Sequence, residues 1–240
     1  MAAQLVFRRR EIKYVITDAQ YEALLPILQQ HMKPGKYGEY TICNLYFDTD
    51  DFTIIRASLE KPIYKEKLRV RSYGTPKRAG KCYVEIKKKF KGVVYKRRVE
   101  LPVDAAKAWL IHGTKPEAYG QIHREIDWFL SFYQCTPKVY LAYDRTELTG
   151  VDDPDLRVTF DRKVRFRTDD LNLTSGDRGE VILPPDLRIM EVKIPGAIPL
   201  WLSAALDALD IRKASYSKYG KAYEHTLHDP NSKLGDVFHA

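Results

Sequence analysis

The stretch YKEKLRVR, residues 64–71, alternates between two kinds of side chain with a period of two. Such alternation is typical of a β-strand, because successive side chains along a strand point to opposite faces. The four cationic residues at the odd-numbered positions therefore share one face, and Leu68 and Val70 lie on the opposite face. We predict a strand that is apolar on one side and presents a row of positive charge on the other.

The next two segments of the chain repeat this arrangement. In CYVEIKKK the side chains of Glu85, Lys87 and Lys89 share one face, and in the following segment Lys96 and Arg98 do the same. Three successive strands are therefore predicted to have their cations on one side. Shorter polar rows of the same kind occur elsewhere in the chain and include Arg9, Glu11, Lys13, Tyr143, Arg145, Arg157, Glu191 and Lys193.

The positive charge of the chain is concentrated in these three segments. The 240 residues include 40 Lys and Arg and 32 Asp and Glu, which gives a net charge of +8. Residues 61–100 alone contain 15 Lys and Arg and 3 acidic residues, so this region has a net charge of +12 and the remainder is net negative. A local excess of this size indicates an anionic partner, and composition leaves open nucleic acid, anionic lipid or a small polyphosphate.

Composition also excludes several classes of protein. The chain is 44% hydrophobic, which is enough for a globular core, and no apolar run approaches the roughly 18 residues of a membrane-spanning helix. The N-terminus lacks the apolar segment of a secretory signal, so we expect a soluble, cytoplasmic protein. Cys43, Cys82 and Cys135 are odd in number and widely spaced, which favours free thiols over a disulfide framework or a zinc site.

Periodicity predicts a single domain over residues 1–228, followed by a loosely ordered tail over residues 229–240. Strands are predicted at residues 8–16, 40–48, 64–73, 81–89, 93–101, 138–147, 156–167 and 187–194, with a further hairpin through 171–183. Helices are predicted to start at Thr17 or Asp18, with a kink at Pro26, and near Asp104, Pro116, Pro199 and Ser217.

The charged faces of these strands fit an enclosed site better than a solvated surface. A wet sheet face usually mixes charge signs with Ser, Thr, Asn and Gln, whereas these faces are dominated by Lys and Arg. If the sheet closes on itself with its apolar faces outward under the helices, the cations line a tunnel. Converging donors at low dielectric suit a ligand of dense negative charge, such as a chain of phosphates.

Three glutamates recur among these cations. Each of them is either an ion-pair partner or a ligand of a divalent cation, because carboxylate oxygens suit Mg²⁺ and Mn²⁺, which accompany triphosphate chemistry. Glu191 is the first candidate for the metal ligand, followed by Glu11 and Glu85.

Nine short motifs between Arg9 and Tyr219 resemble one known family. In chain order they are REIKYVI, NLYFDT, EKLRVRSYG, YVEIKKK, YKRRVEL, YDR, LRVTFD, MEVK and SKYGKAY. This series is similar to the catalytic domain of the vacuolar transporter chaperone (VTC) polyphosphate polymerases, within the triphosphate tunnel metalloenzymes. The resemblance implies an α+β fold with a closed, eight-stranded antiparallel β-barrel that encloses a tunnel, and with flanking helices.

The resemblance also implies roles for individual residues. The residues expected to hold the reacting phosphates are Arg69, Arg71, Lys87, Arg145 and Arg157. Further substrate contacts are expected from Lys13, Lys96, Arg98, Tyr143, Lys193, Ser217 and Lys218, of which Arg98 and Lys193 are included because they lie on the charged faces. The metal ion, Mn²⁺ or Mg²⁺, is expected at Glu191, with Glu11 and Glu85 as the other candidates.

One departure favours the polymerase branch of the superfamily. Hydrolytic members begin with an ExExK strand, whereas this chain has Arg9 where the first glutamate of that motif would be. We therefore expect transfer of the γ-phosphoryl group of ATP to a growing polyphosphate chain. The SPX region and membrane anchor of the eukaryotic polymerases are missing, which implies a stand-alone, bacterial form.

Two alternatives remain. The first is a tripolyphosphatase or nucleoside triphosphatase on the same fold. The second is a noncatalytic module that binds polyanions or nucleic acid, which would require a face of stacking aromatic rings. Tyr64, Tyr73, Tyr83 and Tyr95 fall mostly on apolar faces or at strand ends, so no nucleic-acid partner is expected.

Overall fold

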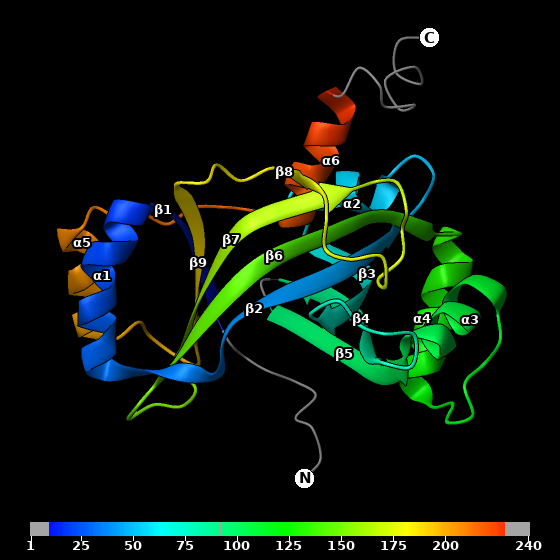
Figure 1. Ribbon diagram of the computed structural model, residues 1–240, viewed down its shortest axis with the longest axis horizontal. Coiled ribbons are helices and arrows are strands. Elements are labelled where there is room, and N and C mark those ends of the chain that lie inside the picture. Colours follow the sequence, from blue (N-terminus) through cyan, green and yellow to red (C-terminus); the bar gives the residue numbers. More distant parts are fainter. Residues whose placement is uncertain (1–9, 92, 229–240) are drawn as a thin grey trace.

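The structure is a computed structural model that describes residues 10–91 and 93–228. Within these residues the chain forms one antiparallel sheet and six helices (Figure 1). The strands are β1 (Arg10–Thr17), β2 (Met32–Asp48), β3 (Tyr64–Tyr73), β4 (Lys81–Phe90), β5 (Val93–Pro102), β6 (Thr136–Gly150), β7 (Arg157–Arg167), β8 (Glu180–Val181) and β9 (Leu187–Ile194). The helices are α1 (Asp18–His31), α2 (Thr53–Leu59), α3 (Val103–His112), α4 (Gln121–Tyr133), α5 (Leu200–Ala208) and α6 (Lys218–His228).

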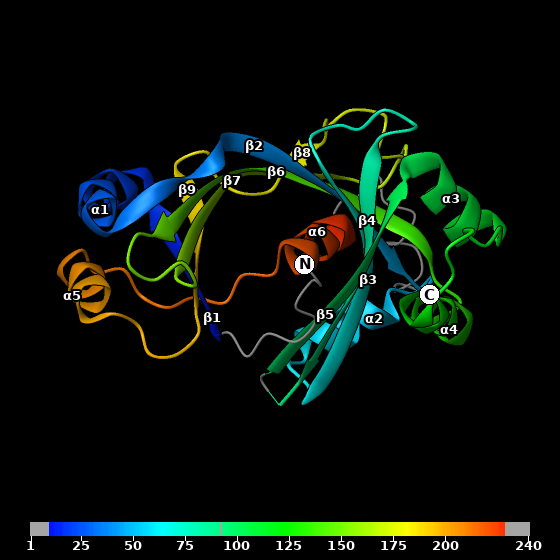
Figure 2. The same ribbon diagram turned by 90° about the horizontal axis from the view of Figure 1, so that it is seen from below.

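The sheet is open, so the prediction of a closed barrel is wrong. Its strands follow the order β1-β9-β7-β6-β2-β3-β4-β5, with β8 paired to β7, and no backbone pairing joins the described residues of β1 and β5. The sheet curves around α6, which lies inside the curve (Figure 2). An eight-stranded barrel has an interior just wide enough for side chains. Here a helix and many long cationic side chains occupy that space, so the two edge strands remain apart.

Helices α1, α3, α4 and α5 lie outside the curve, at its two ends (Figure 2), whereas α2 packs against α6 and β3. Helices α1 and α5 cover the outer face of β1, β7 and β9, where Ile16, Val158 and Val192 are fully buried with Leu24 and Leu202. Helices α3 and α4 cover the outer face of β3, β4 and β5. The sheet is therefore apolar on its convex side, as the alternation predicted.

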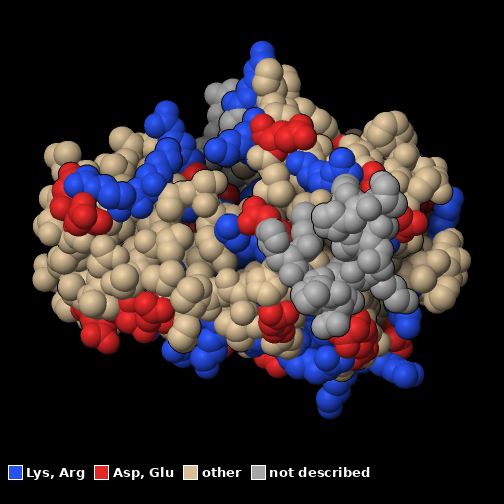
Figure 3. All heavy atoms as spheres, turned by 90° about the horizontal axis from the view of Figure 1, so that it is seen from above, with Lys and Arg blue, Asp and Glu red and all other residues tan. Residues whose placement is uncertain are grey.

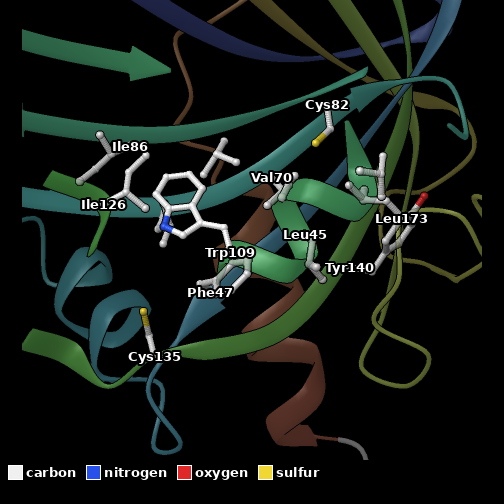
Figure 4. Close-up of a cluster of buried hydrophobic side chains, with 14 of the residues drawn as sticks. Leu45, Phe47, Val70, Cys82, Ile86, Trp109, Ile126, Cys135, Tyr140 and Leu173 are labelled. Atoms are coloured by element: carbon white, nitrogen blue, oxygen red, sulfur yellow. The ribbon is translucent and has the colours of Figure 1, made fainter. Parts of the chain in front are cut away.

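The buried cluster under α3 and α4 confirms the two faces predicted for β3. Leu68 and Val70 of β3 are buried together with Ile86 of β4, and they pack in one cluster with Trp109 of α3 and Ile126 of α4 (Figure 4). Because side chains alternate along a strand, the cations of these strands point to the concave side. We call this concave side of the sheet the inner face.

Most predicted elements are present, with shifted ends. The first described strand begins at Arg10, and residues 8–9 lie outside the described residues, as does the predicted tail. Helix α1 begins with a capping box formed by Thr17 and Gln20 and continues past Pro26, where we had predicted a kink. Of the hairpin predicted through residues 171–183, only β8 forms.

Helix α2 was not predicted, because its first turn is stabilised from outside the helix. The residue before it, Phe52, has no side-chain cap, so the usual start signal is missing. Instead the buried carboxylate of Asp48 accepts hydrogen bonds from the amides of Ile54 and Ile55, at 2.9 and 3.0 Å. The same carboxylate accepts from the hydroxyl of Tyr219 at 2.8 Å, which joins α2 and α6 to the end of β2.

Within residues 10–91 and 93–228, none of the helices has the length and apolar character needed to cross a membrane.

Candidate functional site

The inner face gathers charged side chains from most strands of the sheet and from the first residue of α6. Viewed from above, lysine, arginine and carboxylate side chains lie close together near the middle of the molecule (Figure 3). The predicted site residues that meet on this face are Lys13, Arg69, Arg71, Glu85, Lys87, Lys96, Arg145, Glu191, Lys193 and Lys218. Three carboxylates organise these cations.

The first carboxylate, Glu85 of β4, is fully buried. Its Oε2 accepts from Nε of Arg69 at 2.9 Å and lies 3.9 Å from Nε of Arg71, and its Oε1 lies 2.6 Å from Nζ of Lys96. Burial would raise the pKa of Glu85, but the three cations outweigh this effect and hold its pKa well below the usual range. Glu85 is therefore an anion that fixes the direction of three cations.

The second carboxylate, Asp161 of β7, was missed in the sequence. It is fully buried and forms a bidentate pair with Arg145, with Nε to Oδ1 at 2.6 Å and Nη2 to Oδ2 at 2.8 Å. Lys218 at the start of α6 adds a third contact at 2.5 Å. Burial favours the neutral acid, but Lys218 and Arg145 lower the pKa of Asp161 to about 2.

The signal for Asp161 was present in the sequence. In RVTFD it lies four residues after Arg157, so the two side chains share a face of β7. Asp161 was missed because the candidates for a metal ligand were the three glutamates that recur among the cations, and Asp161 is an aspartate.

The third carboxylate, Glu191 of β9, has Oε1 3.0 Å from Nζ of Lys193. Burial raises its pKa, but Lys193, Lys13 and Arg145 together lower its pKa far below the usual value. Directly across from it in the sheet lies Thr159, whose buried hydroxyl has no hydrogen-bond partner among the described residues. An oxygen without a partner beside a buried carboxylate gives this part of the inner face spare capacity to bind a ligand.

Tyrosine hydroxyls lie between the arginines. Arg71 donates from Nε to Asn44 at 3.0 Å and from Nη2 to the hydroxyl of Tyr143 at 3.4 Å, and Arg69 donates to the hydroxyl of Tyr46 at 3.1 Å. Burial would raise the pKa of Tyr143, but the nearby arginines Arg71 and Arg145 lower it. The neighbourhood of Tyr143 is therefore strongly positive.

In one part of the inner face, around Lys67 and Lys13, lysines lie close to one another. Burial lowers the pKa of Lys67 to about 7, and the nearby cations Lys65, Lys13 and Lys87 add to this effect. For Lys13 burial, Lys218 and Lys87 outweigh Glu191 and lower its pKa to about 8. Burial is the larger cause of both shifts, and the neighbouring lysines add to it. An anionic ligand would supply counter-charge at this place.

Lys87 and the remaining predicted residues make separate contacts. Lys87 pairs with Glu11 at 3.3 Å, which connects β4 to β1 across the open edge of the sheet. Arg98 is exposed, with its guanidinium over the ring of Tyr83 at 4.7 Å. Arg157 has a buried Nε without a hydrogen-bond partner among the described residues. Ser217 caps α6 by accepting from the amide of Gly220 at 3.1 Å.

The two ends of the inner face along β3 and β4 carry different side chains. Where β3 begins and β4 ends, a pocket of about 420 Å³ is lined by lysines, which are Lys61, Lys65, Lys89 and Lys91. At the opposite end, where β3 ends and β4 begins, Tyr73 and Tyr83 lie edge to face with ring centroids 5.8 Å apart. We call these regions the lysine end and the tyrosine end.

No group of three or more His, Cys, Asp or Glu side chains that could hold a metal ion occurs in the described part of the chain. Mg²⁺ in phosphate-transfer sites is commonly bound by one or two carboxylates together with the phosphates of the substrate, so a three-residue cluster is not required. Glu191, with the hydroxyl of Thr159 free beside it, fits this kind of site.

The VTC domain profile matches residues 8–227, which is nearly the whole chain. The chain belongs to the VTC domain family. None of the curated proteins matches this VTC domain in sequence.

Solved structures share its fold at low identity. A protein from Bacillus halodurans, described as a candidate adenylate cyclase, is 15% identical over 88% of this chain and 96% of its own, with a TM-score of 0.55. A Hippeastrum protein, described as a candidate adenylyl cyclase with a dominant triphosphatase activity, is 16% identical over 90% of this chain and 95% of its own, with a TM-score of 0.53. This VTC domain therefore has the fold of the triphosphate tunnel proteins.

Proposed function

We propose that this VTC domain is a polyphosphate polymerase that transfers the γ-phosphoryl group of ATP to the end of an inorganic polyphosphate chain and releases ADP. One observation supports a polymer in particular. The cations of β3 continue from Arg71 to Lys65, a span of six residues or about 20 Å along a strand, and then into the lysine-lined pocket. A row of this length exceeds what three linked phosphates need, so it can hold a longer chain.

In this proposal the arginines hold the triphosphate. Arg69 and Arg145 are each fixed by a buried carboxylate, Glu85 and Asp161 respectively, so their remaining donors are already oriented before the substrate arrives. Oriented donors in a buried site stabilise the negative charge that builds up on the β,γ-bridging oxygen during transfer, without the cost of reorganising water. Glu85 and Asp161 act as positioning residues.

The lysines Lys13, Lys96 and Lys218 add point charges close to the arginines. Lysine donors are rotatable and lack a fixed fork geometry, so they suit a chain whose phosphates occupy successive positions. The hydroxyl of Tyr143, which already accepts from Arg71, lies where it can bond a phosphate oxygen.

The transfer needs no general base from the protein. An oxygen of the terminal phosphate of the acceptor chain, already ionised near neutral pH, forms the new bond to the γ-phosphorus. The bond from the γ-phosphorus to the β,γ-bridging oxygen breaks, and ADP leaves with that electron pair. Catalysis then consists of positioning and charge stabilisation. This agrees with the inner-face groups described above, which are cations, carboxylates and hydroxyls.

Glu191 and the hydroxyl of Thr159 would hold Mg²⁺ or Mn²⁺ together with phosphate oxygens. When bound, the ion would neutralise developing negative charge and keep the phosphates in line. Lys193, at 3.0 Å from Glu191, helps to keep this carboxylate ionised.

The test is to incubate the purified protein with ATP and Mn²⁺ or Mg²⁺ and to separate the products on a gel that resolves long-chain polyphosphate. We expect polyphosphate and ADP in the wild type, and a loss of about 10²–10³ in rate for Glu191→Gln. Glu117→Gln, an exposed carboxylate in the segment before α4, is the matched control and should retain full activity.

The second candidate is hydrolysis of tripolyphosphate or nucleoside triphosphates, which the activity described for the Hippeastrum protein favours. Orthophosphate as the sole new product, with no polymer at any ATP concentration, would refute the polymerase proposal and support this one. Full activity of Glu191→Gln would remove Glu191 from the metal site.

A further inference from the structure

Four tyrosine rings lie in a row at the tyrosine end, and the proposed chemistry does not use them. Ring centroids are 6.3 Å apart for Tyr37 and Tyr40, 6.0 Å for Tyr40 and Tyr73, and 5.8 Å for Tyr73 and Tyr83. The guanidinium of Arg98 lies over the last ring at 4.7 Å. We call these four residues the tyrosine row.

Tyr73 and Tyr83 of this row are on the inner face, which corrects part of the sequence interpretation. Tyr73 and Arg71 are two residues apart on β3, and Tyr83 and Glu85 are two residues apart on β4, so each pair shares a face. Tyr83 therefore lies among the charged residues rather than on the apolar side. The face of stacking rings that was judged missing from the sequence is present at one end of the site.

The row adjoins the arginines proposed to hold the phosphates. Tyr40 is directly opposite Arg145 in the pairing of β2 with β6, and Tyr83 is directly opposite Arg71 in the pairing of β3 with β4. Residues directly opposite in an antiparallel pair have Cβ atoms about 5 Å apart. Tyr73 is two residues beyond Arg71, which is about 7 Å along a strand. A ribose with its α-phosphate can span the distance between Tyr73 and Arg71.

The rings are accessible to a ligand. Tyr37 is 71% exposed and Tyr73 is 51% exposed, although large aromatic side chains are usually well buried. An exposed ring beside an arginine offers a flat apolar surface and a flat cationic one, which are the two surfaces on which a nucleobase stacks. A chain of phosphates has no flat apolar part, so the tyrosine row is not suited to binding polyphosphate.

The lysine end provides an internal comparison. Exposed rings also occur near that end, at Tyr64, Phe90 and Tyr95, but alternation places each of them on the outer face of its strand. Within residues 10–91 and 93–228, exposed rings therefore adjoin the cationic site at the tyrosine end and not at the lysine end.

We propose that the tyrosine row, with Arg98, binds the nucleobase of the nucleoside triphosphate whose phosphates lie on the neighbouring arginines. This inference rests on the proposed function, because it assumes that a nucleotide is the phosphate donor. It also gives the site a direction: the base lies at the tyrosine end, and the phosphates extend from it toward the lysine end.

The test compares the binding of ATP with that of inorganic tripolyphosphate, which has the phosphates and no base, by titration calorimetry on the full chain. We expect Tyr73→Ala to weaken ATP binding about tenfold and to leave tripolyphosphate binding unchanged. Tyr73→Phe keeps the ring and should bind ATP as the wild type does. Tyr95→Ala removes a tyrosine of similar exposure from the outer face of β5, and it should change neither affinity.

Each other outcome overturns the inference in a recognisable way. Unchanged ATP binding in both Tyr73→Ala and the double variant Tyr73→Ala with Tyr83→Ala would show that the row does not bind the base. Equal weakening of ATP and tripolyphosphate would make the row part of the phosphate site. Loss of binding to a single-stranded RNA oligonucleotide, with ATP binding intact, would make it an RNA surface.

The proposed function fails differently. If it is wrong, wild-type protein will form no polyphosphate from ATP, whether or not the tyrosine variants distinguish ATP from tripolyphosphate.

Discussion

The lysine end and the tyrosine end belong to the same two strands, yet they present opposite chemistry. At the lysine end, Lys65 and Lys89 point into a pocket that two further lysines complete. At the tyrosine end of the same strands, the rings of Tyr73 and Tyr83 lie edge to face. Point charges on flexible stems bind any polyanion, whereas rings and a guanidinium plane recognise a flat group. The difference indicates one end suited to a repeating polymer and another suited to a single kind of head group.

The largest effect is expected in the middle of the face, where both ends depend on the same groups. Arg69→Ala removes an arginine that Glu85 orients, so synthesis should fall about 10²–10³-fold and both ATP and tripolyphosphate should bind more weakly. Product formation and calorimetric binding measure this. Arg97→Ala, on the outer face of β5, is the matched control. If Arg69→Ala weakened ATP binding alone, Arg69 would belong to the nucleotide end and not to the part of the site that both ligands share.

A smaller effect is expected from pH, and it should be greater toward the lysine end. The pKa of Lys67 is lowered to about 7, mainly by burial and then by the neighbouring lysines, so this side chain loses its proton as pH rises above 7. A bound polyanion favours the charged form, so its binding takes up protons and the affinity for polyphosphate should fall about tenfold between about pH 7 and 8.5. Lys67→Met should reduce this dependence, and Lys13, whose pKa is lowered to about 8 by burial and by Lys218, accounts for part of what remains.

The stability of the free protein should change in the opposite direction over the same range. An unfolded lysine titrates near 10.4, so between about pH 7 and 10 the unfolded chain binds more protons than the folded one. The free energy of unfolding should therefore rise with pH when no anion is present. Melting curves with and without tripolyphosphate measure both effects, and parallel pH trends in the two series would contradict the lowered pKa of Lys67.

The smallest effect is expected at the lysine end itself. Lys89→Ser removes one exposed point charge, which should weaken long-chain polyphosphate about fivefold at low salt and leave ATP binding unchanged. Lys88→Ser, the next residue and on the outer face, is the control. Equal loss of ATP affinity in Lys89→Ser would mean that the two ends do not have separate tasks.

Strand alternation was enough to predict the inner face, because Leu68 and Val70 can be buried under helices only if Arg69 and Arg71 point the other way. Closure of the sheet could not be predicted in this way, since it depends on what fills the interior. Alternation does not reveal that α6 enters the curve. Helix α2 was missed for a related reason: Asp48 caps it from a strand, so no local pattern marks its start.

Within the site, residue type was a better guide for cations than for their partners. A lysine or arginine on a charged face is conspicuous, whereas a single acid such as Asp161 looks like an ordinary surface residue until its burial is known. Tyr83 shows the same limit. Its position near the start of β4 is evident from the sequence, but its neighbours across the strands are not, because they depend on register.

Among the described residues, no strand pairs with the outer side of β1 or of β5, although the amide of Ala214 donates to the carbonyl of Lys13 on the outer side of β1. Unpaired edges of this kind are prone to add strands from other molecules, and natural proteins oppose this with charge and with proline. Strand β5 has three consecutive cations, Lys96 to Arg98, and ends in Pro102, while β1 begins with Arg10 and Glu11. The charges that crowd this domain therefore also oppose aggregation, by making each edge a poor template for a second chain.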